Sequence, residues 1–157
     1  MKKNTPMILA VRKARNTMNR DLGGPFGAAV TDKDGKLLAV SSNRVLSSHD
    51  PTAHAEIMAI RAACRKLGTH DLTGCAVYAT GYPCPMCLGA MIWANVKVCY
   101  YGNDPKEAEE IGFRDDFIYD FIKNGRKDES VMRFEQTDHD ETAELYKEYS
   151  EKDKEIY

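Results

Sequence analysis

Hydrophobic positions recur along the chain with two spacings, one typical of helices and one typical of strands. Short apolar runs bounded by turn residues predict strands, and Asp-Lys-Asp-Gly at 32–35 predicts a hairpin turn. Proline after a capping residue marks helix starts, and Gly68 marks a helix end. We expect strands at 26–31, 36–42, 76–80 and 96–101, and helices from 5 to near 23, 50–67, 84–94, a short one from 104, 115–123 and 141–154. This order predicts an α/β fold with a mixed sheet covered by helices on both faces.

Size and composition predict a single domain. The 157 residues, 43% of them hydrophobic, suffice for one core, and we find no repeats, linkers or low-complexity segments. The N-terminal Met-Lys-Lys at 1–3 leads only into a short apolar stretch at 7–11, which soon meets Arg12 and Lys13. That pattern predicts neither a signal peptide nor a membrane span, so we expect a cytoplasmic protein.

Two short motifs carry the chemistry. His54 and Glu56 stand two residues apart, and Cys84 and Cys87 follow about thirty residues later with the spacing of a metal-binding pair. One imidazole and two thiolates form a zinc site with a fourth position for water, the arrangement of catalytic zinc. Zinc lowers the pKa of such a water from 15.7 toward roughly 7. Glu56, which need not bind the metal, is then the candidate carrier of protons.

Helix geometry sets a condition on this site. Asp50 and Pro51 predict the cap and first residue of the helix that contains His54 and Glu56. Residues two apart on a helix are turned by about 200°, so the two side chains converge only if the metal lies beyond the helix end. Cys84 and Cys87 lie one turn apart at a second helix start, where the helix dipole favours thiolates.

Other interpretations of the cysteines remain open at this point. A Cys-x-x-Cys pair can be a redox couple or half of a structural zinc site, for which His49 or His70 would be the fourth ligand. Neither histidine has a spacing that favours this role. The odd count of five cysteines argues against a disulfide framework, and we expect Cys64, Cys75 and Cys99 to be small buried side chains.

Longer stretches resemble a known family. The matching segments are GGPFGA at 23–28, Asn43, DPTAHAE at 50–56, PCPMCLGA at 83–90, EIGFRDDFIY at 110–119 and EIY at 155–157. They are similar to the cytidine deaminase superfamily and, more narrowly, to short bacterial guanine deaminases. The resemblance implies a three-layer α/β/α domain with a central mixed sheet of five strands. Arg114 departs from the family pattern, which has an acid there.

The resemblance also implies roles for single residues. One Zn²⁺ per subunit would bind His54, Cys84 and Cys87, with Glu56 as proton shuttle. The substrate contacts would be Phe26 stacking on the base, Asn43 and the N–H of Ala55 on a polar edge, Asp115 accepting from guanine N–H groups, and Tyr157 from the neighbouring subunit of a homodimer that exchanges a C-terminal segment of about 125–157. Each contact has an ordinary structural alternative. Phe26 could be core, Asn43 a turn cap, Asp115 a helix cap and Tyr157 a frayed end.

The implied reaction converts guanine and water to xanthine and ammonia, by attack of zinc-activated hydroxide at C2 while Glu56 protonates N3. Rival hypotheses are a cytosine or ammeline deaminase, a deaminase of adenosine in transfer RNA, and a zinc-binding module without turnover. Nucleic-acid binding requires a basic surface. The net charge is −2, and residues 135–157 carry nine acidic side chains against three lysines. This charge balance argues against a nucleic-acid partner. The partner that the resemblance implies is a small nucleobase, and we expect no membrane partner.

Overall fold

The computed structural model describes residues 4–157, so residues 1–3 of the N-terminal stretch lie outside the described range. The chain divides into two compact units, the first reaching Tyr119 and the second comprising Asp120–Tyr157. Each unit is described by itself. Within the described range, no helix is long and apolar enough to cross a bilayer.

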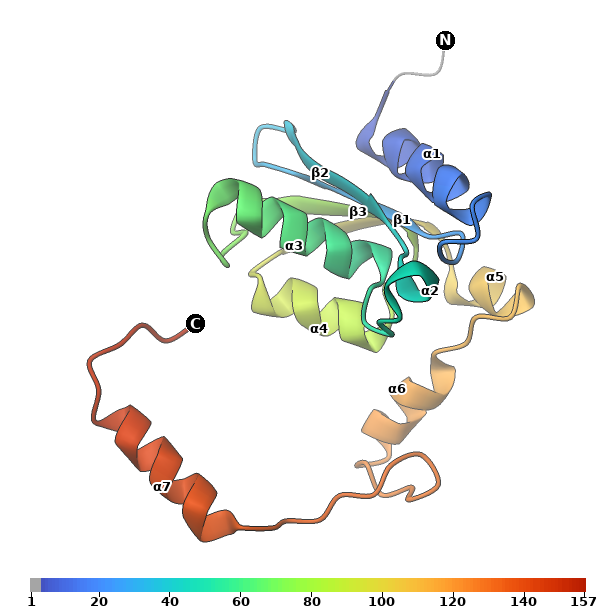
Figure 1. Ribbon diagram of the computed structural model, residues 1–157. Coiled ribbons are helices and arrows are strands. Elements are labelled where there is room, and N and C mark those ends of the chain that lie inside the picture. The colour runs from blue at the N-terminus through green and yellow to red at the C-terminus, as the bar shows by residue number, and fades with distance from the viewer. Residues whose placement is uncertain (1–3) are drawn as a thin grey trace. The chain divides into compact units, whose positions relative to one another are not determined.

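The centre of the first unit is a mixed sheet with the strand order β2-β1-β3-β4 (Figure 1). The strands are β1 (Gly27–Thr31), β2 (Leu37–Ser42), β3 (Ala76–Gly81) and β4 (Val98–Asn103). Strand β1 pairs antiparallel with β2 and β3, whereas β3 and β4 are parallel. The expected mixed sheet is confirmed, but it has four strands in the described residues rather than five. Beyond β4 the chain turns directly into a capped helix, which leaves β4 as an edge strand.

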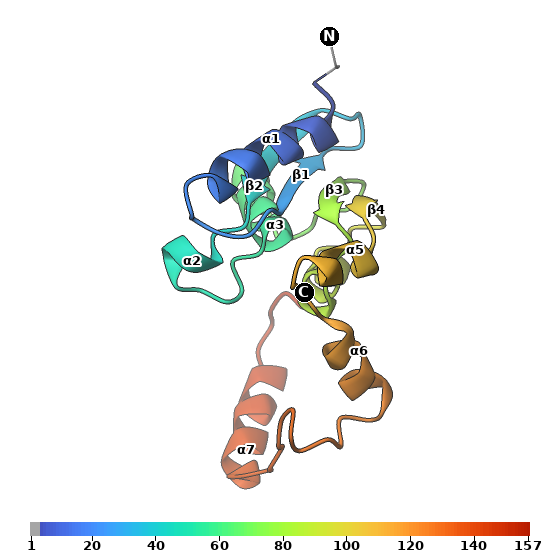
Figure 2. The ribbon, with the colours of Figure 1, turned by 90° about the vertical axis from the view of Figure 1, so that its right-hand side faces the viewer.

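Helices cover both faces of this sheet, as the sequence predicted (Figures 1 and 2). Helix α1 (Pro6–Met18) packs on one face, and α3 (Ala55–Leu67) with α4 (Pro85–Trp93) lies on the other. Successive side chains of strand β1 point to opposite faces of the sheet. Because helices cover both faces, every residue of β1 is buried. A Cβ on Gly27 would lie 2.1 Å from the carbonyl oxygen of Ala10 in α1, so only glycine permits this approach. Ala28 and Val30 join the core beneath α3.

Local chemistry explains where the helices begin. Helix α1 starts after Thr5, whose side chain accepts a hydrogen bond from the Ile8 N–H at 3.3 Å, with Pro6 as its first residue. The expected start of the next long helix at Asp50 is wrong. The Asp50 carboxylate instead accepts from the Thr52 N–H and hydroxyl at 2.8 and 2.7 Å, which closes a turn, and α3 begins only at Ala55. A short helix, α2 (Val45–Ser48), precedes this turn and was not predicted.

Helix α5 (Pro105–Glu110) follows β4 at once. The Asp104 carboxylate accepts from the Glu107 N–H at 3.0 Å, and the Glu107 carboxylate accepts from the Asp104 N–H at 2.8 Å. This capping box satisfies N–H groups that a helix start otherwise leaves without partners. It fixes the start of the segment 105–118, which supplies side chains to the pocket described below.

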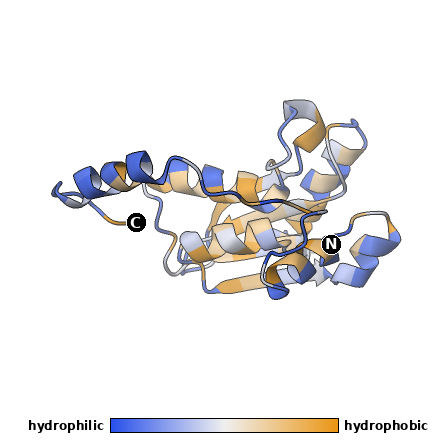
Figure 3. Ribbon diagram, turned by 90° about the horizontal axis from the view of Figure 1, so that it is seen from below, coloured by the Kyte–Doolittle hydropathy of each residue, from blue (hydrophilic) through white to orange (hydrophobic). Residues whose placement is uncertain are grey.

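The second unit is small and polar. Helix α6 (Asp116–Lys123) crosses into it from the first unit, and α7 (His139–Ser150) is exposed along its length. Colouring by hydropathy shows the strands as mainly hydrophobic and α7 as mainly hydrophilic (Figure 3). Inside this unit the Phe121 and Phe134 rings stack with centroids 6.2 Å apart. The expectation of one domain with an exchangeable C-terminal segment stays a prediction.

Candidate metal centre and adjoining pocket

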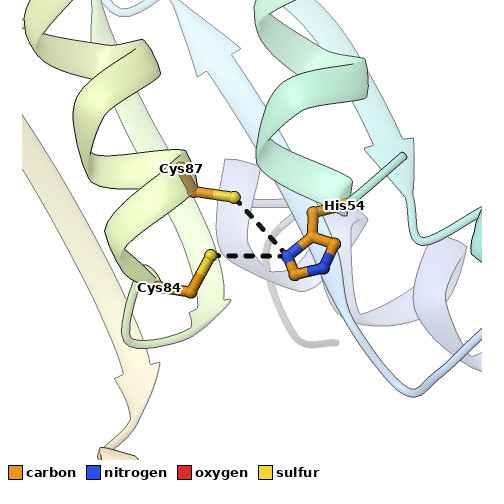
Figure 4. A group of neighbouring side chains, drawn as sticks. All are labelled: His54, Cys84 and Cys87. Atoms are coloured by element: carbon orange, nitrogen blue, oxygen red, sulfur yellow. Dashed lines mark hydrogen bonds between the residues drawn. The ribbon is translucent and has the colours of Figure 1, made fainter. Parts of the chain in front are cut away.

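The three predicted ligands come together at the starts of α3 and α4 (Figure 4). His54 Nδ1 lies 3.6 Å from Cys84 Sγ and 3.7 Å from Cys87 Sγ, and the three ligand atoms lie within 4.8 Å of one another. His54 and Cys84 are the N-cap residues of their helices and have extended backbones, and Cys87 lies in the first turn of α4. His54 is therefore outside the helix that contains Glu56, so the geometric condition set by their spacing is met.

These distances fit a tetrahedral zinc ion. Zn–N and Zn–S bonds of about 2.0–2.3 Å place neighbouring ligand atoms about 3.5–3.8 Å apart. Within the described chain, the group of metal-binding side chains at this point comprises His54, Cys84 and Cys87 without a fourth residue. Three protein ligands leave one coordination position for water or substrate, as in catalytic zinc sites. His49 and His70 are not part of the group, which excludes the closed structural site as an interpretation.

The cysteines are all reduced. None of the five, which all lie in the described range, forms a disulfide. Cys75 is buried, and the half-buried Cys64 and Cys99 pack against the core, as expected for small apolar side chains. Their pKa values are raised by burial, so these thiols stay protonated.

The two ligand cysteines differ electrostatically from the other three. Hydrogen bonds from the Cys87 thiol and from His54 lower the pKa of Cys84 to about 4. The same interaction raises the pKa of Cys87, because the two sulfurs then share one negative charge. A divalent cation between them stabilises both as thiolates. This donor set therefore suits a soft or borderline metal such as zinc.

Glu56 lies close to the metal ligands in sequence but does not belong to their group. It lies in the first turn of α3 with only 8% of its surface exposed, and its carboxylate is not part of the metal-binding group. Burial is the main reason that its pKa is raised above the usual value of 4.5. A carboxyl group that exchanges protons closer to neutral pH is what general acid–base catalysis requires.

A cavity of about 590 Å³ within the first unit adjoins the ligands, and His54, Cys84 and Glu56 line part of it. Phe26, Asn43 and Asp115 also line it, so the structure brings three of the predicted substrate contacts to this cavity. The side chain of Ala55 is fully buried. Tyr157 belongs to the second unit and is 81% exposed, so its role stays a prediction.

Asn43 is held in place by the oxygen of its side-chain amide. The oxygen Oδ1 accepts from the Val45 N–H at 3.1 Å and from the Gly24 N–H at 3.4 Å, and the residue is buried. It therefore acts as a turn cap, one of the two roles considered for it. These bonds occupy the acceptor of the amide and orient its Nδ2 amino group as the donor available to a ligand.

Asp115 precedes α6 and begins that helix through its backbone. Its carbonyl oxygen accepts from the N–H groups of Ile118 and Tyr119 at 3.0 and 3.4 Å. Burial, followed by the negative charge of Cys84, raises the pKa of that carboxylate. The neighbouring Arg114 pairs with Asp116 at 2.8 Å.

Sequence reasoning missed one residue of the pocket, Phe113, and one residue beside it, Tyr119. The Phe113 ring meets the Phe26 ring edge-on with centroids 4.9 Å apart, and the Tyr119 hydroxyl donates to the Pro83 carbonyl at 3.1 Å. Both missed side chains lie in the segment 110–119 that already carried the family resemblance. The remaining lining comes from Gly23, Gly24, Val45, Leu46, Pro51, Gly81, Tyr82, Met86, Pro105, Ala108, Arg114 and Ile118.

A three-ligand centre at two helix starts of an α/β/α sandwich, beside a buried glutamate, is the architecture of zinc-dependent deaminases. The family model described as the cytidine and deoxycytidylate deaminase zinc-binding region matches residues 1–103, and the chain belongs to this family. Family and geometry together make the centre a site for one Zn²⁺ per subunit.

Similarity to individual proteins is more specific than the match to the family model. Guanine deaminase from Bacillus subtilis is 42% identical over 137 residues, which cover 87% of each chain. The X-ray structure of guanine deaminase from this organism has a TM-score of 0.89 at 38% identity and covers 100% of this chain and 99% of its own. The tRNA-specific adenosine deaminase of Agrobacterium fabrum is 44% identical over 110 residues, covering 69% of this chain and 71% of its own.

Proposed function

We propose that this protein is a guanine deaminase, which hydrolyses guanine to xanthine and ammonia. One observation carries the proposal. The similarity to the Bacillus subtilis guanine deaminase structure extends over the whole chain, including residues beyond 103 where the family model ends. The similarity to the Agrobacterium fabrum adenosine deaminase is equally high in identity but covers only 69% of the chain.

The pocket offers complementary groups for an aminated purine. The Phe26 ring, braced by Phe113, provides a surface on which a flat base can stack. The Asn43 amino group and the Ala55 N–H would donate to acceptors of the base, and the Asp115 carboxylate would accept from its N–H groups. Guanine presents both kinds of partner, a carbonyl oxygen and ring N–H groups. A site that satisfies both discriminates against bases that lack either one.

The chemistry then depends on the buried carboxylate beside the metal ligands. A bound zinc ion supplies Lewis acidity, which makes water acidic enough to provide hydroxide near neutral pH. Glu56 accepts the proton that water loses and delivers it to N3 of the base as C2 becomes tetrahedral. The same carboxylate then takes the proton of the new hydroxyl group on C2 and passes it to the amino nitrogen. The C2–N bond breaks, ammonia leaves, and the C2 carbonyl of xanthine remains. Its raised pKa suits a group that must both take and give a proton.

Charge disfavours a polynucleotide substrate. The whole chain carries −2, and residues 135–157 carry nine acids against three lysines. A protein that neutralises phosphates needs the opposite balance. A base within RNA must also be extruded before it reaches the metal, whereas a free base need not.

We further propose that the active form is a homodimer in which Tyr157 of one subunit completes the pocket of the other. Residues 120–157 form a separate compact unit with exposed apolar side chains, Tyr146 at 78% and Ile156 at 78% among them. Helix α4 also exposes Ile92 and Trp93, the latter at 73%. Isolated apolar side chains are ordinary on a surface, but several large exposed ones in the C-terminal unit and on α4 support contact with a partner subunit. We place the enzyme in the cytoplasm, because the ligand cysteines must stay reduced to bind metal.

Ammonia release from guanine, adenine, cytosine and ammeline tests the substrate. We expect guanine to be the preferred base. A transfer RNA that is a substrate of tRNA-specific adenosine deaminases should release no ammonia. The control is Glu56→Gln, which should keep zinc bound but lower turnover by roughly 10²- to 10⁴-fold, as expected for the loss of general acid–base catalysis. Preference for another base would overturn the assignment to guanine. Loss of zinc in the Glu56→Gln protein would make Glu56 a structural residue.

A further inference from the structure

A hydrogen bond links the pocket wall to the turn that carries a metal ligand. The Tyr119 hydroxyl donates to the carbonyl oxygen of Pro83 at 3.1 Å, and Pro83 is the buried residue immediately before Cys84. A buried carbonyl needs a donor, and here the donor comes from a different element. Burial raises the pKa of Tyr119 to about 12, so its hydroxyl stays protonated and able to donate throughout the physiological range.

The turn has few other anchors. Pro83 and Pro85 have no backbone N–H to donate. Tyr82 donates its N–H to the Asn103 carbonyl at 2.9 Å, which fastens one side of the turn to the end of β4. The Tyr119 hydroxyl fastens the other side to α6.

Tyr119 is also connected to the carboxylate that lines the pocket. Its N–H donates to the Asp115 carbonyl at 3.4 Å, so the two residues are one helical turn apart at the start of α6. The cation closest in sequence to Asp115 is engaged elsewhere, because Arg114 pairs with Asp116 at 2.8 Å and with Glu109 at 3.5 Å. The position of the Asp115 carboxylate therefore follows the position of α6, which the tyrosine ties to the ligand turn.

We propose that Tyr119 is a positioning residue for base recognition, which fixes Asp115 at the pocket by anchoring α6 to the Pro83–Cys84 turn. The proposal rests on the proposed function, since it takes Asp115 as a contact of the base. Tyr119 itself belongs neither to the metal-binding group nor to the residues that line the cavity. It acts through Asp115 and should affect the binding of the base rather than the chemical step.

Substitution of Tyr119→Phe removes the hydroxyl but keeps the ring. We expect KM for guanine to rise roughly tenfold, while kcat and zinc content change by less than about twofold, because the lost interaction serves binding in the ground state and transition state alike. The matched control is Tyr100→Phe. Tyr100 stacks on Tyr78 with ring centroids 4.8 Å apart, on the sheet face opposite Val77 and the α3 core, and its substitution should leave KM unchanged.

A double-mutant cycle with Asp115→Asn isolates the coupling. If Tyr119 acts through Asp115, Tyr119→Phe should raise KM by less than about twofold in the Asp115→Asn protein. Independent, multiplying effects of the two substitutions would overturn the proposal. So would loss of zinc or a fall in kcat in Tyr119→Phe, since the tyrosine would then support the metal ligands. If the wild-type protein leaves guanine intact but deaminates another base, only the assignment to guanine is refuted. The double-mutant cycle is then measured with that other base as substrate.

Discussion

Glycine at position 23 matters because a buried amide occupies the space beside it. A Cβ added at Gly23 would lie 2.3 Å from the carbonyl oxygen of Asn43 and 2.5 Å from its Oδ1. Neither atom is the end of a long flexible side chain, so Asn43 would have to move. The metal ligands are on other elements and would not be displaced.

The variant Gly23→Ala should therefore retain zinc but raise KM for guanine by roughly tenfold or more, as expected for the loss of one good hydrogen bond to the substrate. Steady-state kinetics with metal analysis measures both quantities. The matched control is Gly89→Ala, where an added Cβ meets nothing within 4 Å and the helix gains a better helix-forming residue. Normal guanine kinetics in Gly23→Ala would contradict the role given to Asn43.

Single residues differ in how far the sequence alone predicts them. The ligands His54, Cys84 and Cys87 could be predicted because few residue types bind zinc and their spacing is restricted. Glu56 followed from its place beside His54. Phe113 and Tyr119 could not be predicted as pocket and anchor residues, because their importance lies in contacts with Phe26 and Pro83, which only the folded chain creates.

At the scale of elements, helix starts place the site. Each of α3 and α4 presents a ligand at its N-cap, so the position of the metal depends on where two helices begin. The strands could be predicted to within about two residues from apolar runs and turn residues. The predicted start of α3 was wrong because an aspartate followed by proline suits both a helix cap and a tight turn. The two hydrogen bonds that Thr52 donates to the Asp50 carboxylate stabilise the turn.

Two helix caps of similar chemistry offer a matched comparison. Asp104→Ala removes the cap of α5, which borders the pocket through Pro105 and Ala108, and Thr5→Ala removes the cap of α1. Each should lower the free energy of unfolding by about 0.5–2 kcal/mol. Only Asp104→Ala should also raise KM for guanine. Denaturant unfolding and steady-state kinetics test this prediction. Equal KM values in the two variants would show that α5 does not contribute to substrate binding.

At the scale of the whole molecule, exchange of C-terminal segments makes a distinctive prediction. In the proposed dimer, each site combines the Glu56 of one subunit with the Tyr157 of the other. Glu56→Gln protein and protein lacking Tyr157 should each be nearly inactive on guanine. When the two are unfolded together and refolded as a mixture, mixed dimers should recover activity, because one of their two sites has both intact residues.

Native mass spectrometry distinguishes mixed dimers from the two parental dimers by the mass of one tyrosine residue, and refolding each variant alone is the control. A mixture that stays inactive although mixed dimers are present would show that Tyr157 acts within its own subunit. Full activity of the protein lacking Tyr157 would remove the terminal tyrosine from the site. The sequence suggested this arrangement only through family resemblance, because nothing in the local pattern of residues 125–157 determines which subunit they join.

The most direct test of the central claim is a zinc titration of metal-free protein with guanine as substrate. Xanthine formation, followed by its absorbance, should be absent without metal and should rise linearly until one zinc ion is bound per chain. Turnover of guanine by protein shown to be free of zinc, or guanine left unchanged by protein that holds one zinc ion per chain, would contradict the account.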